Sequence, residues 1–133
     1  MALRASEKST APPFTQDDID AAVHAARQCY QAVWQRMAPV DRGRLLQKLS
    51  AKVLEHADEL TALEQRDCGK PTKQAKADAA ALARYFEFYA GACDKLHGDT
   101  IPYLDGYSVM TWREPHGVTG HIVPWNYPMQ IIG

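Results

Sequence analysis

The sequence lacks an excess of charge of either sign and lacks a long apolar run. Lys and Arg total 15 of the 133 residues, and Asp and Glu total 16, which gives a net charge of -1. Proteins that bind the backbone of nucleic acids usually carry a basic patch, so we expect no nucleic-acid partner. Residues 1–9 are charged and have no apolar core of the kind found in signal peptides, and no segment is apolar over a membrane-spanning length. We therefore expect no membrane partner either.

Cysteine is also scarce, and its number is odd. Cys29, Cys68 and Cys93 are widely spaced, which argues against a disulfide framework and favours a reducing compartment, so we expect a cytoplasmic protein. Cys29 and Cys93 fall on or beside apolar helical faces, where a buried and unreactive thiol is expected. Cys68 falls at a helix C-terminus, whose partial negative charge disfavours a thiolate. None of the three is therefore a good nucleophile, and the histidines and cysteines show no paired metal-ligand spacing.

The chain opens with a polar segment and then takes on helical periodicity. Residues 1–14 mix Ser, Lys, Thr and Pro and are expected to form a mobile arm. Thr15 and Asp18 have the spacing of a capping box, which predicts that the first helix begins there. Pro39 ends this helix and also suits the first turn of the next one. Apolar residues at steps of three and four predict one buried face, formed by Ile19, Val23, Ala26, Tyr30, Val33 and Met37.

A second helical pattern follows and is interrupted near His56. Gly43 weakens its start by up to ~1 kcal/mol relative to alanine. The pattern stops at residues 67–71, where Gly69 suits a left-handed cap and Lys70 is interpreted as a favourable charge at the helix C-terminus. The positions expected to be apolar and buried are Val40, Leu45, Leu46, Leu49, Val53, Leu54, Ala57, Leu60 and Leu63.

A third helical pattern is the most regular and is predicted to close at His97-Gly98. Its steps of four and three would also suit a coiled-coil seam, but packing against the preceding helices is favoured because they too have apolar faces to cover. The expected apolar face consists of Ala75, Ala79, Leu82, Phe86, Tyr89, Cys93 and Leu96. The residues expected on the other faces are Lys73, Lys76, Asp78, Arg84 and Glu87.

Beyond the third helix the periodicity changes to that of strands. Residues 100–103 are short and extended, and Asp105-Gly106 is a turn signal. Strand-forming residues at 107–112 and 118–123 flank a turn at 115–117, which predicts a two-stranded hairpin or bent ribbon. A ribbon of two strands is not stable alone in water, so we expect it to need a sheet or a partner subunit.

Two motifs carry a resemblance to a known family. The segment 114–128 resembles the signature region of the NAD(P)-dependent aldehyde dehydrogenase superfamily. The matching residues are Glu114-Pro115-x-Gly117-Val118-x-Gly120-x-Ile122-x-Pro124-Trp125-Asn126-x-Pro128. Upstream, the segment 64–71 resembles the acidic-Gly-Lys-Pro corner of the same family, with the residues Glu64-x-x-Asp67-x-Gly69-Lys70-Pro71. The resemblance covers roughly residues 15–133.

The resemblance implies an α/β fold in four parts. Residues 1–14 are an arm, residues 15–98 form the helical part of the coenzyme-binding domain, and residues 99–117 form a β-ribbon of the oligomerisation type. Residues 118–133 contain the first strand of an incomplete, Rossmann-like nucleotide-binding core. The family also implies a homo-oligomer, either a dimer or a tetramer.

The resemblance further implies the oxidation of an aldehyde substrate to the carboxylic acid, with NAD or NADP as the cofactor. By its matching position, Asn126 would donate its side-chain amide to the oxyanion of the thiohemiacetal intermediate, and a donor fixed between prolines can do so without reorganising. Asp67 matches a position that helps to bind a monovalent cation in some members. Tyr127 and Gln130 are similar to betaine-aldehyde-type members. The residues implied to line the cofactor are Ile122, Val123, Pro124, Trp125 and Asn126.

The sequence also departs from the family pattern. Cys68 stands where the family usually has threonine, and no Gly-x-Gly-x-x-Gly motif is present. The chain ends before the positions of the family's catalytic cysteine, general-base glutamate and cofactor-phosphate lysine, and residues 128–133 resemble only the first turn of an apolar helix. We therefore expect a fragment that is inactive alone and either poorly folded or self-associating.

Two alternatives remain open at this point. Asn126 could instead cap the helix that starts at Pro128, since asparagine is common at that position. The chain as a whole could be a non-catalytic helical module that serves binding or oligomerisation.

Overall fold

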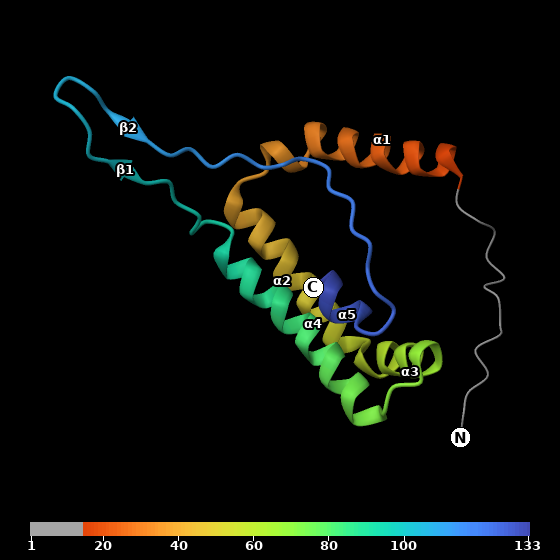
Figure 1. Cartoon of the computed structure of the whole chain (residues 1–133). Coiled ribbons are helices and arrows are strands. Elements are labelled where there is room, and N and C mark those ends of the chain that lie inside the picture. The colour runs from red at the N-terminus through yellow and green to blue at the C-terminus, as the bar shows by residue number, and fades with distance from the viewer. Residues whose placement is uncertain (1–14) are drawn as a thin grey trace.

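The computed structural model describes residues 15–133, which form a helical body with a small ribbon at one end (Figure 1). No helix in this part of the chain is long and apolar enough to cross a membrane. The elements in chain order are α1 (Gln16–Ala32), the 3-10 helix η1 (Trp34–Arg36), α2 (Pro39–Glu55), α3 (Ala57–Cys68), α4 (Thr72–Ala92), β1 (Thr100–Ile101), β2 (Val109–Met110) and α5 (Pro128–Ile132).

The core lies where α4 meets α2, α3 and α5 (Figure 1). It is small because many apolar side chains of α2, such as those of Leu45, Leu49 and Leu54, remain exposed. The arrangement confirms that the third helical pattern packs against the preceding helices. The buried members of the core are Val53, Ala79, Leu82, Ala83 and Met129, with Ala57, Leu60 and Phe86 packed against them.

The helix boundaries follow the local signals. Thr15 and Asp18 form the predicted capping box, in which the backbone N–H of Thr15 donates to Asp18 Oδ2 at 2.9 Å and the N–H of Asp18 donates to Thr15 Oγ1 at 3.3 Å. His56 separates α2 from α3 as predicted. Gly69 adopts the left-handed conformation with φ 68°, and its N–H donates to the carbonyl of Gln65 at 2.9 Å.

Gly43 has a packing role that its helix propensity does not reveal. It is buried, and a Cβ built on it would lie 2.6 Å from the backbone carbonyl oxygen of Ala90. Glycine therefore allows the backbones of α2 and α4 to approach closely, which offsets the cost of a glycine inside a helix.

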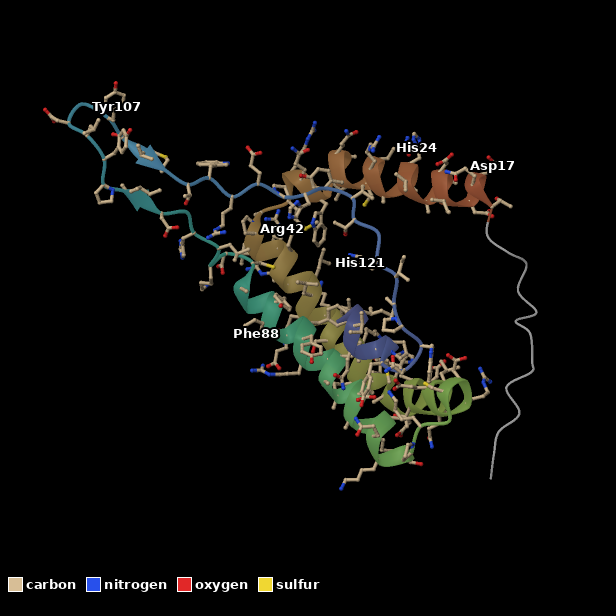
Figure 2. All side chains as sticks on the ribbon, in the orientation of Figure 1. Asp17, His24, Arg42, Phe88, Tyr107 and His121 are labelled. Carbon is tan, nitrogen blue, oxygen red and sulfur yellow. The ribbon has the colours of Figure 1, made fainter. Side chains whose placement is uncertain are left out.

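The predicted buried face of α1 is exposed in this chain. None of the residues of α1 is buried, and the side chains of Ile19 and Val23 are 50% and 38% exposed. Figure 2 shows side chains of α1 such as His24 projecting outward. The reason is that, among the described elements, α1 makes its main contacts with η1 and not with α2, α3 or α4, so its apolar face is left uncovered. Cys29 is exposed for the same reason, so the prediction of a buried thiol was wrong there.

The third helix is shorter than predicted. α4 ends at Ala92 rather than at His97-Gly98, and Cys93 forms its C-cap. Leu96 consequently lies outside the helix and is 77% exposed, so it does not extend the apolar face.

The hairpin also differs from the prediction. β1 pairs with β2 in antiparallel register, with Thr100 opposite Met110 and Ile101 opposite Val109. The connecting turn contains Gly106 at φ 80°, which a glycine adopts without strain. Within residues 15–133, the segment 118–123 is assigned to no strand. The Asp105-Gly106 turn signal was therefore the one that closes the hairpin.

We predict that Gly43→Ala lowers the free energy of unfolding by about 1–3 kcal/mol, because the added methyl group forces α2 away from the backbone of α4. Gly91→Ala is the matched control, since Gly91 also lies in a helix but has no atom within 4 Å of a Cβ built on it. The control should gain roughly 0.5–1 kcal/mol from helix propensity. Urea unfolding followed by circular dichroism measures both, and equal effects would contradict the close approach.

Candidate functional site

The predicted oxyanion and cofactor residues lie consecutively on the segment that runs into α5 (Figure 1). Their side chains are largely open. Ile122 is fully exposed, Trp125 is 74% exposed and Asn126 is exposed, whereas Val123 is half-buried. These five positions are consecutive, so the exposed side chains of Ile122, Trp125 and Asn126 lie on one short segment, and their roles toward a cofactor stay predictions.

Asn126 does not cap α5. The N-cap of this helix is Tyr127, Pro128 occupies the first turn, and no side chain makes a capping hydrogen bond. The alternative in which Asn126 caps the helix from Pro128 is therefore wrong. Its amide is left exposed at a corner that Pro124 and Pro128 restrict on either side.

A charge network with a buried centre lies beneath this corner, and we call it the buried charge network: Glu64, Lys70, Gln74, Asp78 and Gln130. Gln130 is half-buried and Gln74 is exposed. Lys70 Nζ lies 2.6 Å from Glu64 Oε1 and 2.5 Å from Asp78 Oδ2. The side chains of Lys70, Glu64 and Asp78 are only 9%, 2% and 0% exposed. Lys70 follows the Gly69 cap at the C-terminal end of α3, where a charge was predicted, and it is also an internal counter-ion to two buried carboxylates.

The network reaches the Asn126 corner through two contacts. Gln130 Nε2 of α5 donates to Asp78 Oδ1 at 2.6 Å, and the Tyr127 ring lies with its centroid 4.3 Å from Lys70 Nζ. A lysine at that distance from an aromatic ring is attracted by the ring quadrupole. Gln74 Nε2 donates to the same Asp78 oxygen at 2.9 Å, but from within α4. The network therefore connects the Lys70 corner to the Asn126 corner.

The electrostatics of the network keep both ends of its central ion pair charged. Burial raises the pKa of Asp78, but hydrogen bonds from Lys70, Gln130 and Gln74 outweigh burial and hold the pKa below its ordinary value. Burial lowers the pKa of Lys70, but its bonds to Asp78 and Glu64 outweigh burial and raise the pKa above its ordinary value. Within the described residues, Glu64 Oε2 is buried without a hydrogen-bond partner.

Sequence reasoning missed the network because it placed Asp78 on a solvent-facing side of its helix. Asp78 is three residues after Ala75 and four before Leu82, which puts it on the buried face of α4. That spacing was the available signal. A carboxylate at a core position requires an internal partner, and Lys70 is the cation that the turn at Gly69 brings close.

Cys68 is unsuited to act as a nucleophile. Burial raises the pKa of its thiol, the negative charge of Glu64 raises it further, and the positive charge of Lys70 opposes the rise only in part. The Sγ atom donates to the carbonyl of Glu64 at 3.1 Å. The prediction that Cys68 lacks thiolate character is thus supported by its surroundings.

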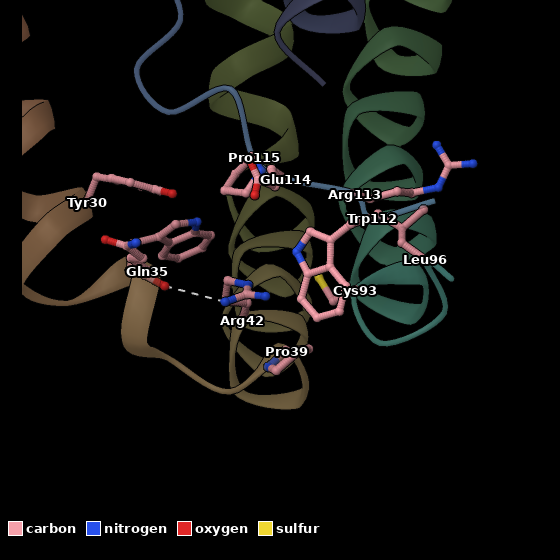
Figure 3. Close-up of a pocket in the computed structure, with 11 residues that line it drawn as sticks. Tyr30, Gln35, Pro39, Arg42, Cys93, Leu96, Trp112, Arg113, Glu114 and Pro115 are labelled. Atoms are coloured by element: carbon pink, nitrogen blue, oxygen red, sulfur yellow. Dashed lines mark hydrogen bonds between the residues drawn. The ribbon is translucent and has the colours of Figure 1, made fainter. Parts of the chain in front are cut away.

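A cavity of about 890 Å³ lies at the base of the ribbon, between η1, α2, the end of α4 and residues 112–115 (Figure 3). Arg42 stands in it, and its Nη1 donates to the carbonyl oxygens of Met37 at 2.6 Å and Trp34 at 3.4 Å. The lining includes neither Asn126 nor any member of the buried charge network. The cavity is therefore separate from the predicted site.

No group of three or more His, Cys, Asp or Glu side chains in residues 15–133 is arranged to hold a metal ion. This finding does not bear on a monovalent cation held by backbone carbonyls. The role of the exposed residue Asp67 in such a site therefore stays a prediction.

Comparison with known proteins identifies the family. The model of the aldehyde dehydrogenase family matches residues 4–133, so the chain belongs to that family. It is 44% identical over 115 residues to aldehyde dehydrogenase family 2 member B4, mitochondrial, of Arabidopsis thaliana, covering 85% of this chain and 21% of the relative. It is likewise 44% identical over 115 residues to human retinal dehydrogenase 2, covering 84% and 22%. The chain thus spans about a fifth of the length of these relatives.

Solved structures agree with this identification. A putative aldehyde dehydrogenase from Burkholderia cenocepacia is 65% identical, with a TM-score of 0.83 over 87% of this chain and 24% of that chain. An NAD-dependent aldehyde dehydrogenase from Sinorhizobium meliloti is 36% identical, with a TM-score of 0.84 over 91% and 24%. The resemblance noted in the sequence is confirmed, and the fold is the corresponding quarter of an aldehyde dehydrogenase, rich in helix with a small two-stranded sheet.

We predict that Asp78→Asn lowers the free energy of unfolding at neutral pH by about 3–5 kcal/mol, because Lys70 loses a buried partner. In the wild type, the stabilisation due to the depressed pKa of Asp78 is present above the unfolded pKa, at pH ~4, and is lost as the pH falls through the folded value. The variant should therefore show a shallower acid dependence.

Urea unfolding between pH ~2 and ~7 measures this dependence. The control is Asp58→Asn, since the side chain of Asp58 is 94% exposed and should change stability by no more than roughly 0.5 kcal/mol. An acid limb of unchanged slope in Asp78→Asn would contradict the role of the ion pair.

Proposed function

We propose that this chain supplies the oxyanion donor and part of the cofactor surface of an NAD(P)-dependent aldehyde dehydrogenase that oxidises an aldehyde to the carboxylic acid. Membership of the family supports the reaction class. A structural neighbour from Bacillus cereus, 41% identical with a TM-score of 0.82, was solved as an NAD+ complex, which supports a nicotinamide cofactor. The observation that carries the role of Asn126 is its free amide at a restricted, exposed corner.

In this proposal, Asn126 acts on the oxygen atom of the aldehyde substrate. When a thiolate adds to the aldehyde carbon, the carbonyl oxygen becomes an alkoxide, and the Asn126 Nδ2–H group donates a hydrogen bond to it. A donor that is already in place costs no reorganisation as charge develops, and one such donor is worth ~10²–10³ in rate. The exposed side chains of Ile122 and Trp125 would line the nicotinamide of NAD(P), and that group would supply the hydride acceptor for the same carbon.

The nucleophile and the general base come from a different segment in this proposal. Cys68 has a raised thiol pKa, and Cys29 and Cys93 lie on α1 and at the end of α4, away from the 122–126 segment in sequence. A segment carrying a reactive cysteine and a glutamate would complete the site. Three free cysteines also favour a reducing compartment, and we propose a cytoplasmic location on that ground.

The ribbon favours assembly as a second role. It projects from the helical body with Tyr107 near its tip (Figure 2), and Tyr107 and Met110 are 70% and 63% exposed. Exposed apolar groups on a two-stranded ribbon are typical of an interface. We propose that the ribbon pairs copies of the chain in a homo-oligomer, dimer or tetramer.

We predict that Asn126→Ala lowers kcat for aldehyde oxidation by ~10²–10³ and changes cofactor affinity little, because the donor acts mainly on the alkoxide. The test uses a chimera in which residues 15–133 replace the matching quarter of the Burkholderia cenocepacia protein, which is 65% identical. Aldehyde-dependent NADH formation gives kcat, and fluorescence titration gives cofactor affinity.

The matched control is Gln47→Ala, which removes an exposed amide from α2. It should leave kcat within about twofold of the unsubstituted chimera. An Asn126→Ala chimera with unchanged kcat would refute the oxyanion role.

We predict that Met110→Glu in the same chimera shifts the assembly toward smaller species, because like charges placed face to face in an interface repel and are costly to desolvate. Light scattering measures the mass. Lys76→Glu on α4, which is also exposed, controls for the change of charge. An unchanged mass in Met110→Glu would show that the ribbon is not the interface.

A further inference from the structure

α5 is too short to hold its own position. It spans only Pro128–Ile132, and its N-cap makes no side-chain hydrogen bond. An isolated helix of this length does not form in water, because nucleation costs more than so few backbone bonds return. The place of α5 is therefore fixed by its tertiary contacts, and so is the direction from which Asn126 projects just before it.

Three contacts pin the start of α5 to the helical body. The ring of Tyr127 lies over Lys70 Nζ, the Met129 side chain enters the core beside Leu82, and Gln130 Nε2 donates to Asp78 Oδ1 at 2.6 Å. Only the bond from Gln130 is both directional and charge-assisted, and such bonds are stronger than neutral ones. It is the contact that can set the rotation of the helix as well as its depth.

The acceptor of that bond is itself held still. Asp78 is completely buried, and its other carboxylate oxygen is paired with Lys70 at 2.5 Å, while Lys70 is also paired with Glu64. The carboxylate cannot rotate without breaking the ion pair in a region that water does not reach. Gln130 therefore bonds to a fixed point.

We propose that Gln130 is a positioning residue for Asn126, acting through its hydrogen bond to the Lys70–Asp78 pair. The proposal rests on the function proposed above for Asn126. Gln130 has no contact with the reacting atoms in this account. It fixes the backbone at residues 127–130, and this fixes the place from which the amide of the preceding residue reaches the alkoxide. A displaced donor of this kind loses rate even when it is chemically intact.

A purely structural role is the competing explanation, and the chain contains a matched control for it. Gln74 donates to the same oxygen of Asp78 at 2.9 Å, but it lies in α4 together with Asp78. Replacing either glutamine with methionine removes one amide donor from one acceptor at nearly constant volume. Gln130→Met removes a hydrogen bond between α5 and α4, whereas Gln74→Met removes one within α4.

The first measurement uses the same chimera and does not depend on catalysis, because it follows the exchange of backbone amides. In hydrogen exchange followed by mass spectrometry, the backbone amides of residues 125–133 should exchange at least about fivefold faster in Gln130→Met than in the wild type. Gln74→Met should leave the exchange of these residues unchanged. Equal exchange in Gln130→Met and the wild type, or equal acceleration in both variants, overturns the positioning role.

The second measurement uses the chimera and tests the coupling to Asn126. Gln130→Met should lower kcat about tenfold with unchanged cofactor affinity, and Gln74→Met should not lower it. In a chimera that already carries Asn126→Ala, Gln130→Met should have no further effect on kcat, because no donor is left to position. A tenfold loss that persists in the Asn126→Ala background overturns the proposal.

The experiments distinguish a failure of the oxyanion function of Asn126 from a failure of the positioning role of Gln130. If Asn126→Ala leaves kcat unchanged, the proposed oxyanion function fails, while the exchange experiment still decides whether Gln130 fixes the corner. If Asn126→Ala lowers kcat but Gln130→Met does not, the function stands and the positioning role is wrong.

Discussion

The structure depends on one lysine placed between two carboxylates away from water. Lys70 joins Glu64 of α3 to Asp78 of α4, and through Asp78 it reaches Gln130 of α5. Removing such charges from water costs several kcal/mol for each ion, so the cluster stabilises the fold only while its geometry is good. The left-handed turn at Gly69 provides that geometry, because it ends α3 and directs the next residue back beneath the helix.

The local part of the fold could be predicted from the sequence, whereas the tertiary part could only be predicted in part. The capping box at Thr15, the break at His56 and the left-handed Gly69 each depend on a few neighbouring residues. The exposure of α1 and the pairing of β1 with β2 depend on what the rest of the chain covers. A helical period indicates which face is apolar, but it does not indicate whether another element lies against that face.

The candidate site divides in the same way. The Pro-Trp-Asn motif identifies the family, and the comparisons confirm it, although the roles of Asn126 and of residues 122–125 remain predictions. The buried charge network beneath the motif could not be predicted on the assumption that charged residues of a helix face solvent. Asp78 falls at an apolar position of its own helix, and only an internal cation makes that position tolerable.

Asp78 and Gln130 meet in the structure but lie far apart in the sequence, and this has a consequence for folding. α3 and α4 are neighbours in sequence, so their contacts close short loops, whereas Asp78 and Gln130 are 52 residues apart. Loop-closure entropy grows with that separation, and the later contact is worth making only after its acceptor has been fixed. We expect the helical pairs to assemble first and the Asn126 corner to dock last. The same corner would then open before the packed α2–α4 pair does, since regions joined by few contacts have low local stability.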